Sequence, residues 1–291
     1  MRLCVDDMTQ PHTVHSPATL DDAYAILADR GASGVTVLAG GTDLMVLANA
    51  HQLDAGDFID IWRLNELRGI EDQGDTLRIG ALTTYTQLIQ SGLIREHAPS
   101  LVEASRTIGA IQIQNRGTIG GNVVNASPAG DSLPVLAAFD AEIEIGSSRG
   151  VRRVDFNHFY TGYRRTVLEP GELVLAVRVP KLRAGEHSFF FKVGTRRAQA
   201  ISKVVMGARL SVDAGFVTSV SIAVGSVAPT VIRATRTEAL LKSERLTEVL
   251  AARAQLSITE EVSPISDLRS TAHYRRTVTG NLLFKVLRGF L

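Results

Sequence analysis

The spacing of hydrophobic residues near the N-terminus predicts a small α/β unit. Apolar side chains recur at helical intervals over Pro17–Arg30, and Thr19 or Ser16 is placed to cap that helix. The short apolar runs that follow are typical of buried strands. Strands that alternate with helices favour a parallel sheet. After the helix we expect a strand over Val35–Leu38, a helix over Asp43–Ala50 and a strand over Phe58–Ile61.

A second block of alternating elements follows. A strand is expected over Leu77–Ile79, and the residues Gly117–Gly130 are so rich in Gly, Asn, Ser and Thr that they indicate a long loop. Two later strands are predicted to pair around a turn at Ser147–Gly150. The remaining elements expected here are helices over Thr84–Ser91 and Ser100–Ile108 and strands over Ala141–Ile145 and Val151–Phe156.

The pattern changes after Pro180, where the polar stretch Lys181–Gly185 is typical of a linker. Beyond it, alternating apolar residues predict antiparallel strands, with a hairpin turn at Asp213–Gly215. We therefore predict a domain of residues 1–180, divided into lobes of about 1–65 and 66–180, and a C-terminal domain of residues 181–291. Its expected elements are strands over His187–Lys192, Val204–Val212 and Val217–Val224 and helices near Arg236–Leu241, Leu246–Ala254 and Thr271–Arg288.

Composition narrows the class of protein. The 291 residues carry a net charge of +1, so the basic excess of a nucleic-acid-binding protein is absent. The single cysteine, Cys4, forms no internal disulfide and holds no iron–sulfur cluster or Cys-rich zinc site. No motif for a metal site, secretory leader or membrane-spanning run is present. We expect a cytoplasmic protein without a metal.

Two segments carry paired glycines. The first, Leu38–Asp43 (LAGGTD), joins a predicted strand to a predicted helix, where free N–H groups favour an anion such as a diphosphate. An ordinary turn capped by Thr42 or Asp43 is the alternative. The second lies within Arg116–Asp131, where successive N–H groups are candidates for a second anion site. A surface loop is the alternative there. Neither segment has the glycine spacing of a Rossmann fold.

These strings resemble, in order, the FAD-binding (medium) subunit of the molybdenum hydroxylase family, whose best-known members are xanthine dehydrogenases. The first segment is similar to that family's first FAD motif, and TIGGN at Thr118–Asn122 with Asp131 is similar to its second. The matches span about residues 12–288. Further similar strings are DI at Asp60–Ile61, LNELRGI at Leu64–Ile70, LRIGA at Leu77–Ala81 and GYRRTVLEPGE at Gly162–Glu172.

The resemblance implies a two-lobed, vanillyl-alcohol-oxidase-like (PCMH-type) FAD-binding domain of the α/β (α+β) class, followed by a small C-terminal α/β domain with an antiparallel sheet. It also implies contacts: Thr36–Asp43 wraps the diphosphate and Thr118–Asn122 forms a second clamp, while Asp131 lies near ribose or ribityl hydroxyls and Ile108 lies against the flavin. No catalytic residue is implied. The implied cofactor-binding residues are Thr36, Val37, Leu38, Ala39, Gly40, Gly41, Thr42, Asp43, Ile108, Thr118, Ile119, Gly120, Gly121, Asn122, Asp131, Val174 and Lys192.

The implied function is electron transfer within a hetero-oligomer. A small iron–sulfur subunit with [2Fe-2S] clusters and a large subunit with the molybdopterin cofactor are the implied partners, and FAD is the cofactor of this chain. The external acceptor stays open among NAD, a quinone, a small electron carrier and oxygen. NAD-reducing animal relatives have an acidic stretch after paired arginines, whereas Ala198 and Gln199 follow Arg196–Arg197 here. The alternatives are a self-contained FAD-dependent oxidoreductase and a binding protein that has lost its flavin.

Overall fold

The N-terminal lobe is a three-stranded parallel sheet with two helices. The computed structural model describes residues 13–30, 34–53, 56–196 and 198–291, so the prediction for Cys4 lies outside it. The strands β1 (Thr13–His15), β2 (Thr36–Leu38) and β3 (Asp57–Asp60) lie in the order β1-β3-β2, and both pairs are parallel as predicted. The helices are α1 (Leu20–Arg30), at whose start Thr19 Oγ1 accepts from Asp22 N at 3.1 Å, and α2 (Leu44–Asn49).

The second lobe is built on a five-stranded antiparallel sheet in the order β4-β5-β10-β6-β7. Its central strand, β10, was missed by the sequence patterns. This strand is buried at most positions, so it reads as a continuous apolar run without the alternation of a half-buried strand. The strands are β4 (Ile70–Gln73), β5 (Thr76–Gly80), β6 (Glu142–Ser147), β7 (Gly150–Asp155) and β10 (Leu173–Pro180).

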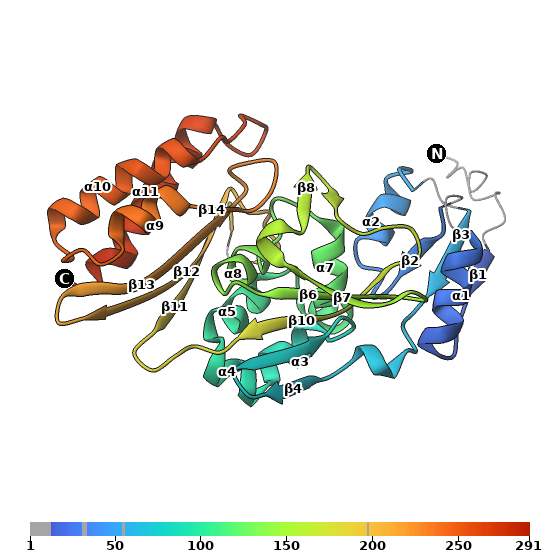
Figure 1. The fold of residues 1–291 in the computed structure, drawn as a ribbon. Helices are drawn as coiled ribbons and strands as arrows, with labels where there is room; N and C mark the ends of the chain where they lie inside the picture. Colours follow the sequence, from blue (N-terminus) through green and yellow to red (C-terminus); the bar gives the residue numbers. More distant parts are fainter. Residues whose placement is uncertain (1–12, 31–33, 54–55, 197) are drawn as a thin grey trace.

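Six helices of this lobe gather beside the sheet (Figure 1). The predicted loop over Gly117–Gly130 was wrong, because its first part forms α7. Thr118 caps α7 by accepting from Gly121 N at 3.2 Å, and the glycines let the helix pack closely. The helices are α3 (Tyr85–Gln90), α4 (Gly92–His97), α5 (Pro99–Thr107), α6 (Ile111–Arg116), α7 (Ile119–Asn125) and α8 (Leu133–Ala138). Short elements complete the lobe: the 3-10 turns η2 (Asn65–Leu67) and η3 (Phe156–His158) and the strand pair β8 (Tyr160–Gly162) and β9 (Arg165–Thr166).

The C-terminal domain is a four-stranded antiparallel sheet in the order β11-β12-β13-β14, and its predicted antiparallel strands and hairpin are confirmed. Helices α9, α10 and α11 cover one face, whereas α5 and α8 of the second lobe contact the other (Figure 1). The elements are β11 (His187–Val193), β12 (Val204–Asp213), β13 (Phe216–Gly225), β14 (Ile232–Arg233), α9 (Thr235–Leu241), α10 (Glu248–Glu261) and α11 (Ala272–Arg288).

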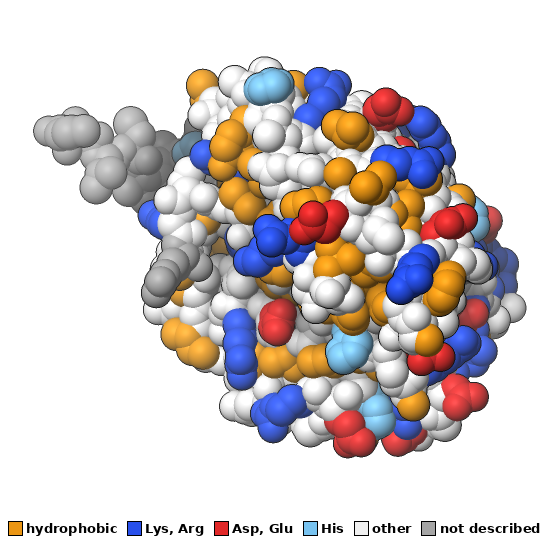
Figure 2. Space-filling model, turned by 90° about the vertical axis from the view of Figure 1, so that its left-hand side faces the viewer, with side chains coloured by type: hydrophobic (Ala, Val, Ile, Leu, Met, Phe, Trp, Pro, Cys, Tyr) orange, Lys and Arg blue, Asp and Glu red, His pale blue; other side chains and the backbone are white. Residues whose placement is uncertain are grey.

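Helix α11 packs on its own domain. Arg275 is buried and donates to the carbonyl oxygens of Lys203 and Ser226, at 2.9 and 2.8 Å. The face of the molecule shown in Figure 2 carries basic, acidic and apolar side chains interspersed, without one dominant charge. No helix among the described residues is both long and apolar enough to cross a membrane.

Candidate functional site

A cavity of about 700 Å³ lies between the two N-terminal lobes. Its wall combines the β2–α2 connection with the segments around α6 and α7 and the start of β10. Most of the lining is apolar, with backbone and a few polar side chains interspersed, which is typical of a cofactor site. The predicted residues that line it are Thr36, Val37, Ala39, Gly40, Gly41, Thr42, Asp43, Ile108, Thr118, Gly120, Gly121, Asn122 and Val174.

The loop of the first glycine segment presents free backbone donors. Gly41 has φ +74°, a conformation that glycine adopts without steric cost. The N–H groups of Gly40, Gly41 and Thr42 donate no hydrogen bond within the described part of the chain, while the carbonyl of Gly41 accepts from Met45 N at 2.9 Å. A loop with several free N–H groups on a cavity wall suits an anionic group such as a diphosphate.

Gly40 is also required by a close approach. A Cβ atom at Gly40 would lie 1.9 Å from the carbonyl oxygen of Arg116, which belongs to α6 of the other lobe. Real side chains cannot occupy that space, and the obstacle is backbone. The first glycine segment therefore touches the second lobe directly.

The second glycine segment is built differently, because the N–H groups of Ile119 to Asn122 are bound inside the protein and are not available for the predicted second anion site. Ile119 N donates to Thr83 O at 3.0 Å and Gly120 N to Ala81 O at 2.9 Å. The next two N–H groups, of Gly121 and Asn122, are bound by Thr118. Because these four N–H donors already have acceptors inside the protein, they are not free to bind a ligand. The segment lines the cavity without offering these N–H groups to it.

Asn122 keeps one donor for a ligand. Its Oδ1 accepts from Ser132 Oγ at 2.8 Å, and the same Ser132 hydroxyl lies 3.4 Å from the Tyr85 hydroxyl. These contacts orient the amide so that its oxygen is bound and its NH2 group has no partner among the described residues. Asn122 lines the cavity, so this NH2 group is available to an acceptor on a bound molecule.

Asp131 and Lys192 form a buried ion pair, and neither lines the cavity. Lys192 Nζ lies 2.5 Å from Asp131 Oδ2 and 3.0 Å from Thr107 O, and Ser202 Oγ donates to Asp131 Oδ1 at 2.6 Å. Burial raises the pKa of the Asp131 carboxyl, against the opposing effect of the Lys192 ammonium. Through these hydrogen bonds the pair connects Thr107 with Ser202. These two residues are the sequence neighbours of Ile108 and Ile201, whose side chains line the cavity.

Two further predicted residues, Leu38 and Ile119, also lie behind the wall. Ile119 is fully buried in the core of the second lobe, and the Leu38 side chain packs beneath Gly41, with 3.3 Å between its Cδ1 and an ideal Cβ there. Sequence reasoning missed other lining residues. Ala81 and Glu172 stand in strings that matched the family, so that signal was available, whereas Ile201 carried none.

Gln114 holds the loop that carries Ile108. Its side-chain amide is buried and donates to the carbonyls of Arg106 and Ile108, at 3.2 and 3.1 Å. Gly109, with φ +54°, follows Ile108 and lets the chain turn into α6. The apolar wall at this end of the cavity is therefore fixed by polar contacts outside it.

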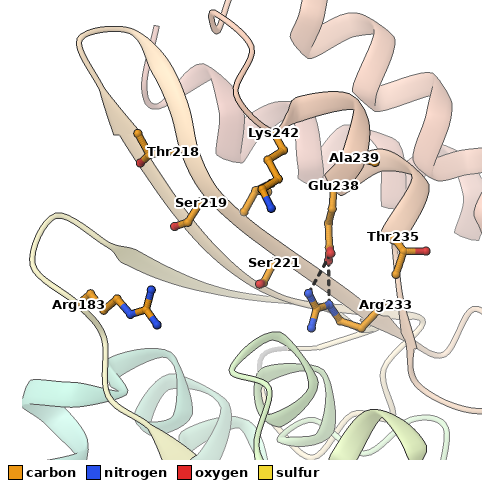
Figure 3. Close-up of a pocket in the computed structure, with 10 residues that line it drawn as sticks. Arg183, Thr218, Ser219, Ser221, Arg233, Thr235, Glu238, Ala239 and Lys242 are labelled. Carbon is orange, nitrogen blue, oxygen red and sulfur yellow. Dashed lines mark hydrogen bonds and ion pairs between the residues drawn. The ribbon is translucent and has the colours of Figure 1, made fainter. Parts of the chain in front are cut away.

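A smaller cavity of about 500 Å³ lies beside β13 and α9 (Figure 3). Its lining is polar, and Glu238 there binds Arg233 through distances of 2.8 and 2.9 Å. Among the lining residues in the described part of the chain there is no glycine, and Val220 and Ala239 are the apolar ones. A planar, largely apolar ring system suits the cavity between the lobes and not this one.

Comparison with known proteins gives consistent matches. Residues 8–182 match the family model of the FAD binding domain in molybdopterin dehydrogenase, and residues 189–290 match that of the CO dehydrogenase flavoprotein C-terminal domain. The chain is 36% identical to the xanthine dehydrogenase FAD-binding subunit of Escherichia coli O157:H7, over 94% of each chain. It is 32% identical to the carbon monoxide dehydrogenase medium chain of Hydrogenophaga pseudoflava, again over 94% of each.

The fold agrees with solved structures. One chain of carbon monoxide dehydrogenase from Hydrogenophaga pseudoflava superposes with a TM-score of 0.91 at 30% sequence identity, covering 94% of this chain and 95% of that one. Because the match covers 94% of this chain, it includes residues of both the N-terminal lobes and the C-terminal sheet.

Proposed function

Because this chain belongs to the family of FAD-binding subunits of molybdenum hydroxylases, we propose that it passes electrons from an iron–sulfur partner subunit to an external acceptor. A third, molybdenum-binding subunit would oxidise the substrate. The observation that carries the proposal is the cavity between the lobes, whose free loop amides suit the diphosphate of FAD and whose apolar walls suit its ring system. When bound, FAD exchanges single electrons and electron pairs, which the side chains of this protein cannot do.

We assign different parts of FAD to different residues of the chain. In our proposal the N–H groups of Gly40, Gly41 and Thr42 bind the diphosphate, and the free NH2 group of Asn122 binds a further acceptor. Ile108, Val174 and Ile201 form apolar walls for the ring system. Burial by these walls excludes water and fixes the orientation of the flavin.

Asp131 and Lys192 receive a different role from the one implied by resemblance. Their charges neutralise each other behind the wall, so we propose that they hold Ile108 and Ile201 in place. Ser202 follows Ile201 and Thr107 precedes Ile108, and both bind this pair. A sugar hydroxyl would have to compete with Lys192, Ser202 and Thr107 for the carboxylate of Asp131.

The alternative, a self-contained oxidoreductase, needs an acid or base beside the flavin. The carboxylates that line the cavity are Asp43 and Glu172. Glu172 is bound at both oxygens by Arg152, at 2.8 and 2.7 Å, and these hydrogen bonds lower its pKa. Burial raises the pKa of Tyr85, which keeps that hydroxyl protonated. Glu172 and Tyr85 are therefore unsuited to abstract a proton from a substrate, and Asp43 stands in the segment that we assign to the diphosphate.

The test begins with the purified chain. We expect the visible spectrum of an oxidised flavin and the release of FAD on acid treatment, with a colourless Gly40→Ala variant as the matched control. A wild-type chain that neither contains nor takes up FAD would refute the proposal. The native complex should then contain molybdenum and iron. Turnover of an organic substrate by the isolated chain would support the alternative instead.

A further inference from the structure

Trp62 lies against two arginines. The guanidinium carbon of Arg68 is 4.3 Å from the centre of the Trp62 ring, and that of Arg116 is 3.8 Å from it. Both distances are well within the range of cation–π attraction, for which tryptophan is the best partner. Trp62 is also the single tryptophan of the chain. The three side chains form a cluster that we call the Trp62 stack.

The Trp62 stack joins the two lobes. Trp62 follows β3 in the first lobe, whereas Arg116 is the last residue of α6 in the second. Arg68 is anchored between them, since it donates to Trp62 O at 2.6 Å and to Leu82 O at 3.2 Å. The contact therefore spans the same two lobes that form the walls of the cavity.

The backbone of Arg116 touches the first glycine segment. Its carbonyl oxygen occupies the space where a Cβ on Gly40 would stand, 1.9 Å away. The next residue, Gly117, would place a Cβ 3.5 Å from Thr42 Oγ1. Any force that holds Arg116 in position consequently also limits the position of Gly40 and Thr42.

The stack has to overcome repulsion between its own cations. Burial lowers the pKa of Arg68, and the positive charge of Arg116 lowers it further. Without an aromatic ring that attracts both, two guanidinium groups this close to one residue would move apart. Arg116 is exposed, so it has room to leave. The attraction between the indole ring and the Arg116 guanidinium thus keeps Arg116 beside the loop.

We propose that Trp62 is a positioning residue for the cofactor: through Arg116 it holds the Gly40–Thr42 loop in the shape that binds the diphosphate of FAD. This inference rests on the proposed function. Trp62 itself does not line the cavity. Its effect is therefore specific for ligands that carry the diphosphate and absent for those that lack it.

The test compares two ligands on the full chain freed of flavin. Trp62→Ala should weaken binding of FAD about tenfold, or ~1.4 kcal/mol, and leave riboflavin, which has no diphosphate, unchanged. Trp62→Phe, which keeps an aromatic face, should lie between wild type and Trp62→Ala. Arg63→Ala is the matched control, because Arg63 is a neighbouring exposed arginine without a ring contact.

A second variant covers the case in which Trp62→Ala does not fold. Arg116→Leu should weaken FAD binding similarly and shift the fluorescence emission of Trp62 to the red, since one ring face then meets water. Equal loss of FAD and riboflavin, or no loss of FAD, overturns the inference. A wild-type chain that binds no FAD overturns the proposed function and this inference with it, whereas normal wild-type binding with unaffected variants overturns the inference alone.

Discussion

The two glycine segments look alike in sequence and differ in structure. Gly40 and Gly41 stand in a loop whose N–H groups are free, while Gly120 and Gly121 stand in the first turn of α7, with their N–H groups bound to Ala81 O and Thr118 Oγ1. In the first segment glycine exposes the backbone to a ligand. In the second it brings a helix close to a neighbouring strand, since a Cβ on Gly120 would lie 2.6 Å from that of Ala81.

Paired glycines in a sequence therefore indicate a site where another group comes close to the backbone. They do not indicate whether that group belongs to a ligand or to another part of the protein. Strand, turn and helix in the first lobe place the Gly40 loop on an open wall. In the second lobe, the turn that follows β5 lies against the start of α7, and its residues Ala81 and Thr83 accept hydrogen bonds from two N–H groups of that helix. Substitutions at the two sites should therefore separate cofactor affinity from stability.

The largest effect is expected for Gly40→Ala. The new methyl group would collide with Arg116 O, so the loop must move and its N–H groups lose their alignment. We expect FAD affinity to fall about a hundredfold, or ~2.7 kcal/mol, measured by titration of the flavin-free protein. Gly92→Ala is the control, because a Cβ there meets nothing within 4 Å. Unchanged affinity would show that the loop does not bind the diphosphate.

Gly120→Ala should act mainly on stability. Its Cβ would lie 2.8 Å from Ala81 O as well as 2.6 Å from Ala81 Cβ, so α7 must shift from β5. Overpacking of this kind costs about 2 kcal/mol, which denaturant unfolding of the flavin-free chain would measure. If that stability stayed at the wild-type value while FAD affinity collapsed, the two segments would be equivalent after all.

Gly41→Ala should give a smaller loss. An alanine at φ +74° costs ~1.5 kcal/mol, and relaxation of that strain would disturb the free N–H groups nearby. The matched control is Gly74→Ala, which has φ +76° with open space around it. Both variants should lose similar stability in unfolding experiments, and only Gly41→Ala should weaken FAD binding. Equal affinities would assign Gly41 a conformational role alone.

The smallest effect is expected for Thr118→Val. Its hydroxyl accepts from Gly121 N, and loss of such a cap costs about 1 kcal/mol. Thr118→Ser keeps the hydroxyl and should restore the stability of the flavin-free chain in thermal unfolding. A Val variant as stable as wild type would mean that the α7 start is held by β5 alone.

Much of the architecture was predictable from local patterns. Short apolar runs and the turn residues between them identified the parallel unit, the β6–β7 hairpin and the antiparallel C-terminal sheet. The central strand β10 was missed, since burial on both faces removes the alternation. Helix α7 was missed because its glycines, asparagines and serine-rich flank favour a loop, and packing against β5 outweighs that preference.

The cofactor site was predictable in part. The strings around Gly40 and Gly120 located two facing parts of the cavity wall from the sequence alone. Ile201 was not predictable, because it reaches the cavity from a segment beyond the first domain. The partner of Asp131 was also hidden, since Lys192 is distant in sequence and the two meet only when the C-terminal sheet packs on the second lobe.

The sequence by itself determined the family, many of the helices and strands, and the positions where the backbone must come close to another group. These follow from residue types and their spacing, which are local. Only the tertiary structure decided which glycine amides are free, which carboxylate is neutralised and which arginine rests on Trp62. Each of those outcomes depends on which groups from separate segments become neighbours and satisfy one another, and that information exists only once the lobes have packed together.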